Sequence, residues 1–275
     1  MSDDTYVLGH TDRELDRLDL QGALYRDVTR RAFADAGLTT GMRVLDIGCG
    51  SGDVSRLAAQ TVGESGWVVG IDRDEGSVRS ARARTPADSY PNVSFEIGHA
   101  ARGDIKETFD ALVGRFVLMH QDDPAGVLAA AARSVRPRGI VVIIESHMAA
   151  LLGSQHSVPH SPIYDEVVRW KCGAVKAAGA DIEAGLRLRQ TFLGAGLSEP
   201  TMRLESAVEG GAESRYYRYV VESIRSMLPQ AAKAGISGMT EDRLAHLETQ
   251  LRDEVVGENG SIMAWPVVAA WCIIP

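Results

Sequence analysis

Short apolar runs alternate with segments of helical spacing between residues 42 and 146, and this alternation limits the fold more than any other feature. The apolar runs cover residues 43–47, 67–71, 93–97, 109–118 and 140–144. The helical segments cover residues 53–62, 75–85 and 124–135. Such alternation is typical of βαβ units with parallel strands, and runs that are apolar on both faces indicate helices on both sides of the sheet. We therefore predict an α/β fold with a doubly wound, mostly parallel sheet.

The composition excludes several classes of protein. The 275 residues are 45% hydrophobic and 24% charged, which suits one large α/β domain, or a core domain with a small appended cap, and disfavours wholesale disorder. The formal net charge of -8 repels phosphate backbones and disfavours general nucleic-acid binding. No apolar stretch approaches the roughly 18 residues of a membrane span. The three cysteines have neither metal-ligand spacing nor an even count, so we expect no metal site and a reducing, cytoplasmic location.

A glycine-rich turn follows the first apolar run, in the segment Val-Leu-Asp-Ile-Gly-Cys-Gly-Ser-Gly that ends at Gly52. Alternate glycines let the backbone turn tightly and approach a ligand closely, and the next helix directs free N–H groups to the same place. This arrangement predicts a nucleotide-like ligand. A dinucleotide fingerprint would require glycine at position 53. Asp53 stands there instead and would place a carboxylate against a pyrophosphate.

The second apolar run ends in Asp72, 24 residues beyond Gly48. A carboxylate at such a strand end can accept hydrogen bonds from both hydroxyls of a ribose. The sequence therefore predicts a nucleoside-binding residue at Asp72.

The pattern Asp46-x-Gly48-x-Gly50-x-Gly resembles motif I of class I S-adenosylmethionine-dependent methyltransferases, of the bacterial small-molecule type that acts on specialised metabolites. Three further segments agree with this resemblance, which covers residues 42–146. Residues 98–100 resemble the family's Gly-Asp-Ala, with His99 in place of the usual acid. Residues 109–120 resemble its fourth strand and following turn, and residues 136–139 resemble its Arg/Lys-Pro-Gly-Gly turn.

The resemblance implies S-adenosylmethionine as cofactor and S-adenosylhomocysteine as product. The sulfonium and the amine of S-adenosylmethionine are cationic, and a carboxylate such as Asp46 can attract them. The residues expected to contact this cofactor are Tyr6, Asp46, Gly48, Cys49, Gly50, Asp72, Arg73, Gly98, His99, Ala100, Arg115, Phe116 and His120. Tyr6 and His10 would belong to an N-terminal arm that closes over the cofactor.

The resemblance also implies a Rossmann-like sheet of seven strands with an antiparallel last strand. We expect residues 199–208 and 261–274 to form the final pair. The predicted segments are a helical arm at 1–40, the cofactor-binding half at 41–146, the rest of the core with an acceptor-side insertion at 147–210 and 259–275, and a helical cap at 211–258. The cap insertions also offer a surface for a homodimer.

Methyl transfer from a sulfonium is an in-line displacement in which positioning contributes most of the acceleration. A general base is needed only when the acceptor arrives protonated. Ligands of open α/β sheets bind at the carboxyl ends of the strands, which makes His120 and His147 the leading candidates for a base, ahead of Glu145, His156 and His160. The residues expected to line the acceptor site are Met119, His147, Trp170, Tyr216 and Tyr217. Plain helix packing is the alternative interpretation of the two tyrosines.

The predicted function is S-adenosylmethionine-dependent methylation of a small molecule, with a bulky specialised metabolite as the acceptor that the resemblance favours. Two alternatives stay open. One is an enzyme that binds the same cofactor but catalyses a non-methylating cyclisation or rearrangement. The other is an NAD-dependent dehydrogenase, which Asp53 disfavours. Neither nucleic acid nor a membrane is an expected partner.

Overall fold

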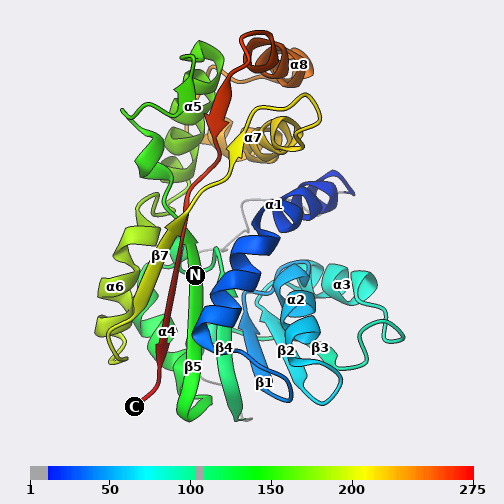
Figure 1. The fold of residues 1–275 in the computed structure, drawn as a ribbon, viewed down its shortest axis with the longest axis vertical. Coiled ribbons are helices and arrows are strands. Elements are labelled where there is room, and N and C mark those ends of the chain that lie inside the picture. Colours follow the sequence, from blue (N-terminus) through cyan, green and yellow to red (C-terminus); the bar gives the residue numbers. More distant parts are fainter. Residues whose placement is uncertain (1–11, 103–107) are drawn as a thin grey trace. The chain divides into compact units, whose positions relative to one another are not determined.

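The computed structural model describes residues 12–102 and 108–275, and the chain divides into two compact units (Figure 1). The first, which we call the sheet unit, comprises residues 25–146, 184–204 and 267–275. The second, the helical unit, comprises the described residues 12–24, 147–183 and 205–266. The predicted division of the chain into four segments stays a prediction.

The sheet unit is built on a seven-stranded sheet with strand order β3-β2-β1-β4-β5-β10-β7. The strands are β1 (Arg43–Ile47), β2 (Trp67–Asp72), β3 (Val93–Ile97), β4 (Phe109–Arg115), β5 (Val135–Ser146), β7 (Thr201–Glu205) and β10 (Val267–Ile273). Strands β1 to β5 pair in parallel. Strand β10 runs antiparallel to β5, with Val267 opposite Ser146 and Ile273 opposite Ile140. The predicted fold class is confirmed.

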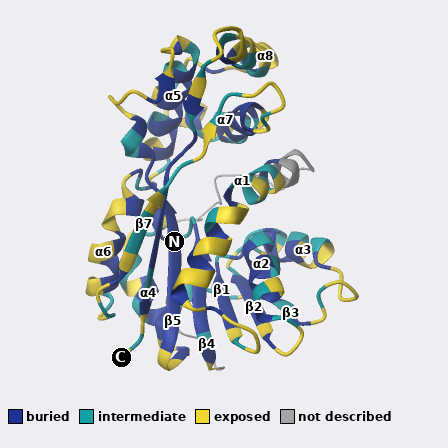
Figure 2. Ribbon diagram, in the orientation of Figure 1, coloured by how far each residue is buried: buried dark blue, intermediate teal, exposed yellow. Residues whose placement is uncertain are grey.

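Helices cover this sheet and supply its core (Figure 1). They are α2 (Asp53–Val62), α3 (Glu75–Arg84), α4 (Pro124–Ala132), α6 (Ala184–Gly194) and the second part of α1 (Asp12–Ala36). Side-chain caps begin two of them: Asp74 accepts from the Ser77 amide and Asp123 from the Gly126 amide. The core contains strand side chains such as Leu45 and Ile143 and helix side chains such as Leu128, while the outer faces of α1 and α6 are exposed (Figure 2).

Several boundaries differ from the expected ones, and β4 ends at Arg115 where the apolar run extends to residue 118. Helix α4 ends at Ala132, and β5 begins at Val135 instead of at residue 140. The pairing of β4 with β5 shifts between Phe109 and Ala111, so the proline–glycine segment forms a bulge inside the strand. The predicted strand 261–274 is two strands, because Pro266 cannot donate a backbone hydrogen bond at the point where they separate.

The helical unit contains α5 (Pro162–Ala177), α7 (Tyr216–Lys233), α8 (Glu241–Gly257) and the first part of α1. A small antiparallel sheet joins β6 (Ser157–Val158), β9 (Ser261–Met263) and β8 (Val208–Glu209). The core of the helical unit is rich in aromatic side chains, with Tyr164, Tyr216 and Trp265 fully buried. Among the described residues, no helix is both long and apolar enough to cross a membrane.

Candidate functional site

The glycine-rich turn after β1 is packed tightly on two sides and open on one. A Cβ atom on Gly48 would lie 2.6 Å from a methyl of Val117, and one on Gly52 would lie 2.7 Å from the Phe95 ring. A Cβ atom on Gly50 would meet no atom of the described residues within 4 Å, although the backbone there has a left-handed φ of 52°. The outer glycines are therefore required for packing, whereas Gly50 leaves a backbone surface that a ligand can approach.

Asp72 joins this turn to the end of β2. One carboxylate oxygen accepts from the Gly50 amide at 3.0 Å, and the other accepts from the Asp74 amide at 3.0 Å. Burial raises the pKa of Asp72, and the two amide hydrogen bonds oppose that shift. Each oxygen has a second lone pair for another donor. The structure thus brings two predicted cofactor residues together; Arg73, the next residue, is exposed.

Asp46 is a buried carboxyl group at the end of β1. Its Oδ2 accepts from the Ser55 hydroxyl, and its Oδ1 has no hydrogen-bond partner among the described residues. Desolvation raises the pKa of Asp46 to about 7, against the opposing effect of the Ser55 hydrogen bond. Its neighbour Cys49 holds the turn to β2 by donating its amide to the Ile71 carbonyl at 3.0 Å. Burial raises the pKa of the Cys49 thiol well above its usual range, so that thiol stays protonated.

The segment after β3 meets the same end of the sheet. The Gly98 amide donates to the Asp72 carbonyl at 3.0 Å. The Ala101 amide donates a hydrogen bond to His99 Nδ1 at 3.2 Å, which leaves Nε2 as the ring nitrogen that can donate. Ala100 begins the short helix η1 (Ala100–Arg102).

Arg115 has structural contacts within the sheet unit. Its guanidinium forms an ion pair with Asp53 and donates to the Thr29 hydroxyl at 3.0 Å. Phe116 follows with a left-handed φ of 59°, and its ring stacks edge-on against Tyr25, 5.1 Å between centroids. These contacts tie α1, α2 and β4 together. The predicted contacts of Arg115 and Phe116 with a cofactor stay predictions.

We expect Arg115→Met to lower the free energy of unfolding by about 1.5–3 kcal/mol, because it leaves Asp53 without its cation and Thr29 without its donor. A urea titration followed by circular dichroism measures this change. Arg189→Met is the matched control, because its ion pair with Glu199 is exposed and should contribute less than about 1 kcal/mol. Equal losses in the two variants would contradict the structural role of Arg115.

The turn after β4 is held by a buried carboxylate. Glu145 Oε1 accepts from the amides of Val117 and Leu118 at 2.9 and 2.7 Å, and this fixes the short helix η2 (Leu118–His120). Met119 is buried in this turn and His120 is exposed. The surrounding protein and the positive charge of Arg73 lower the pKa of His120. Because His120 remains exposed, water offsets part of this desolvation.

The other predicted acceptor residues lie in the helical unit. Three of them are buried with a polar atom that has no partner among the described residues: His147 Nδ1, Trp170 Nε1 and the Tyr217 hydroxyl. Tyr216 instead shares a hydrogen bond of 2.6 Å with the Tyr164 hydroxyl. Tyr6 and His10 lie outside the described residues, and the contact of Tyr6 with a cofactor stays a prediction.

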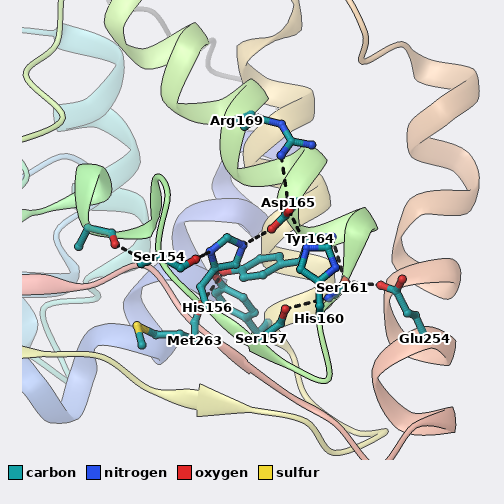
Figure 3. Close-up of polar contacts among 12 residues, drawn as sticks. Ser154, His156, Ser157, His160, Ser161, Tyr164, Asp165, Arg169, Glu254 and Met263 are labelled. Atoms are coloured by element: carbon teal, nitrogen blue, oxygen red, sulfur yellow. Dashed lines mark hydrogen bonds and ion pairs between the residues drawn. The ribbon is translucent and has the colours of Figure 1, made fainter.

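Two of the lower-ranked histidines share one carboxylate at the start of α5 (Figure 3). His156 Nε2 lies 2.8 Å from one oxygen of Asp165, and His160 Nε2 lies 2.9 Å from the other. His156 Nδ1 faces the Ser154 carbonyl at 2.9 Å, and Ser161 caps the helix by accepting from the Tyr164 amide. Both histidines therefore contact the Asp165 carboxylate in the first turn of α5, although His156 Nε2 makes this contact without hydrogen-bond geometry.

The comparisons with known proteins agree with this fold. Residues 38–188, more than half of the chain, match the family model described as a methyltransferase domain. The chain therefore belongs to the methyltransferase domain family. The predicted resemblance to class I S-adenosylmethionine-dependent methyltransferases is confirmed.

Individual relatives match over part of their length. The demethylmenaquinone methyltransferase of Lactococcus lactis is 32% identical over 147 residues, 53% of this chain and 53% of that protein. The aklanonic acid methyltransferase DauC of Streptomyces sp. strain C5 is 32% identical over 126 residues, 46% of this chain and 56% of that protein. The chain thus spans about half the length of these curated relatives. The crystal structure of the YcgJ protein of Bacillus subtilis shares the fold, with a TM-score of 0.58, 15% identity and coverage of 90% of this chain and 98% of that one.

Proposed function

We propose that the chain transfers a methyl group from S-adenosylmethionine to a small-molecule acceptor. The observation that carries the proposal is the open backbone surface at Gly50 beside the carboxylate of Asp72, to which the Gly50 amide donates. A nucleoside fits this pair, because the carboxylate can accept from ribose hydroxyls while the missing side chain leaves space. When it is bound, this cofactor supplies an electrophilic methyl group on a cationic sulfonium.

Different residues of the sheet unit would bind different parts of the cofactor. Asp72 would accept from the ribose hydroxyls, and the Gly48–Gly52 turn would lie against the methionine part. The Oδ1 of Asp46, to which no described residue donates, suits a cationic or N–H group. His99 presents Nε2–H, so it would donate to a ring nitrogen of adenine, where the family's acid would accept from the amino group.

The arrangement around Asp53 supports this cofactor over NAD. Asp53 begins α2 and is paired with Arg115, so a carboxylate stands where a dinucleotide would place its pyrophosphate. S-adenosylhomocysteine should therefore raise the melting temperature of the protein and NAD should leave it unchanged. Stabilisation by NAD alone would overturn the proposed function.

The acceptor and the location of the protein belong to the same proposal. The names of two relatives, a demethylmenaquinone methyltransferase and an aklanonic acid methyltransferase, refer to small-molecule acceptors. These names support a bulky specialised metabolite as the acceptor. A mass spectrum of the products separates methylation, which adds one methyl group, from a cyclisation that adds nothing. The three buried, unbridged cysteines support a cytoplasmic location. A homodimer through the cap insertions stays a prediction that light scattering can test.

We expect the affinity for S-adenosylmethionine to rise as the pH increases through about 7 and then to level off. The pKa of Asp46 is raised to about 7 by burial, and a cationic ligand favours its ionised form, so binding releases a proton. Calorimetry in two buffers of different ionisation enthalpy measures that release. Asp46→Asn keeps an acceptor for Ser55 and should bind without the pH dependence. A pH-dependent Asp46→Asn variant would refute the assignment.

We expect His120→Gln and His147→Gln each to lower turnover by less than about tenfold, because positioning outweighs proton transfer. The lowered pKa of His120 makes it a weak base at neutral pH. A true base would instead cost about 10²–10⁴ in turnover. Release of S-adenosylhomocysteine with an acceptor found by the product mass spectra is the measurement, and Trp170→Ala is the comparison variant, which should lose more turnover. A histidine variant that abolishes turnover while Trp170→Ala stays active would reverse this conclusion.

A further inference from the structure

Lys171 is a buried cation in the helical unit and is not among the residues predicted from the sequence. It lies on α5, and its Nζ donates to the Ser223 hydroxyl at 3.0 Å. That hydroxyl donates in turn to the Val220 carbonyl at 2.9 Å. The ammonium lies 5.0 Å from the ring centroid of Tyr219 and 4.6 Å from that of Trp265. One hydroxyl and two aromatic faces therefore surround a positive charge.

No negative charge faces Lys171 from the side chains that the structure describes, those of residues 17–101 and 108–275: no carboxylate among them pairs with it. Burial and the positive charge of Arg17 lower the pKa of Lys171 to about 7, while the Cys172 thiol opposes this shift. A buried charge normally has a counter-ion, because the aromatic faces and one hydroxyl replace only part of its hydration. An anionic ligand would supply the missing charge.

A second buried polar group, His147, is hydrogen-bonded through its backbone to the residue that follows Trp265. Trp265 precedes Pro266, whose carbonyl accepts from the His147 amide at 2.9 Å. The His147 side chain is buried, and its Nδ1 has no hydrogen-bond partner among the described residues. Cys172, next to Lys171, donates its thiol to the Met148 carbonyl at 3.7 Å. Two hydrogen bonds therefore place the segment of His147 beside the surroundings of Lys171. One is made by Pro266, next to Trp265, and the other by Cys172, next to Lys171.

We propose that Lys171 and His147 bind an acidic oxygen of the acceptor, such as a carboxylate, phenolate or enolate, with Trp265 and Tyr219 as the aromatic sides of the subsite. The proposal rests on the proposed methyl transfer and narrows its substrate class to aromatic or conjugated acids. The Lys171 ammonium donates to the anionic oxygen, and the imidazole of His147 supplies a second hydrogen bond. The two rings favour a flat ligand over a flexible one.

Calorimetry on the full chain saturated with S-adenosylhomocysteine tests this subsite with two probes of similar shape. Salicylate carries the anion and salicylamide is its neutral counterpart. The native chain should bind salicylate at least about tenfold more tightly than salicylamide, as a charge-assisted hydrogen bond predicts. Lys171→Met keeps the length of the side chain and should abolish this preference, and His147→Gln should reduce it. Lys176→Met, an exposed site on the same helix, is the matched control and should keep it.

Each outcome decides between explanations. If the role of Lys171 is purely structural, Lys171→Met should weaken the binding of salicylate and of salicylamide equally. That result would overturn the proposed subsite. Equal or undetectable binding of the two probes to the native chain would also overturn it. Binding of S-adenosylhomocysteine is measured in the same samples, and its failure in the native chain would refute the proposed function instead. If Lys171→Met does not fold, Ser223→Ala provides the second test, because it removes the only hydroxyl that the described residues place on Nζ.

Discussion

Gly50→Val should lower the affinity for S-adenosylhomocysteine by more than about a hundredfold, which corresponds to about 2.7 kcal/mol. Within the part of the chain that the structure describes, a Cβ atom at this position would meet no atom within 4 Å, so the branched side chain would occupy the space left for the ligand. It would also disturb the amide that donates to Asp72. Isothermal titration calorimetry measures the dissociation constant directly.

The control for this variant is Gly196→Val in the same unit. Gly196 follows α6, has a left-handed φ of 74° and also has no atom within 4 Å of an added Cβ. Both variants carry the backbone strain of valine at positive φ, about 1–3 kcal/mol, so their melting temperatures should fall together. Only Gly50→Val should lose the ligand. A folded Gly50→Val protein that binds normally would mean that the glycine-rich turn has been misinterpreted.

Asp72→Ala should weaken the same binding by about 10- to 150-fold for each hydrogen bond lost to the ribose, since bonds to a charged acceptor contribute about 1.5–3 kcal/mol. The substitution also leaves the amides of Gly50 and Asp74 without their acceptor, which loosens the turn. Both effects act in the same direction on the dissociation constant.

Asp110→Ala separates the loss of binding from a general loss of stability. Asp110 also accepts a backbone amide, from Arg43 at 2.7 Å, and pairs with Arg136, but it lies at the amino ends of the strands. Its removal should lower the melting temperature and leave the dissociation constant for S-adenosylhomocysteine unchanged. If Asp110→Ala impaired binding as much as Asp72→Ala, the ribose assignment would be wrong.

The sequence predicted the sheet and its glycine-rich turn because both depend on local patterns. Apolar runs of strand length, the helices between them and the alternate glycines each occupy a few adjacent residues. The end of β2 at Asp72 also follows from local spacing, and the structure places its carboxylate against Gly50.

Contacts between segments that are distant in the sequence could not be predicted from such local patterns. Arg115 pairs with Asp53 and donates to Thr29, and the three residues come from three elements whose separation in the chain hides their contact. Lys171 is surrounded by side chains from α7 and from the residue before Pro266, so no motif marks it. An isolated lysine in a helical segment has the spacing of an ordinary surface residue, and only its burial distinguishes it.

Because its three cysteines are buried, the native chain should react very little with thiol reagents. Cys49, Cys172 and Cys272 are 3%, 2% and 6% exposed, and burial raises the pKa of the last two to about 11 and that of Cys49 well above its usual range. The reactive thiolate would thus be about one part in ten thousand at neutral pH. Cysteines introduced on exposed positions of the two units could therefore carry a pair of fluorescent dyes without prior removal of the native ones. Energy transfer between the dyes would then follow the distance between the units as cofactor and acceptor are added.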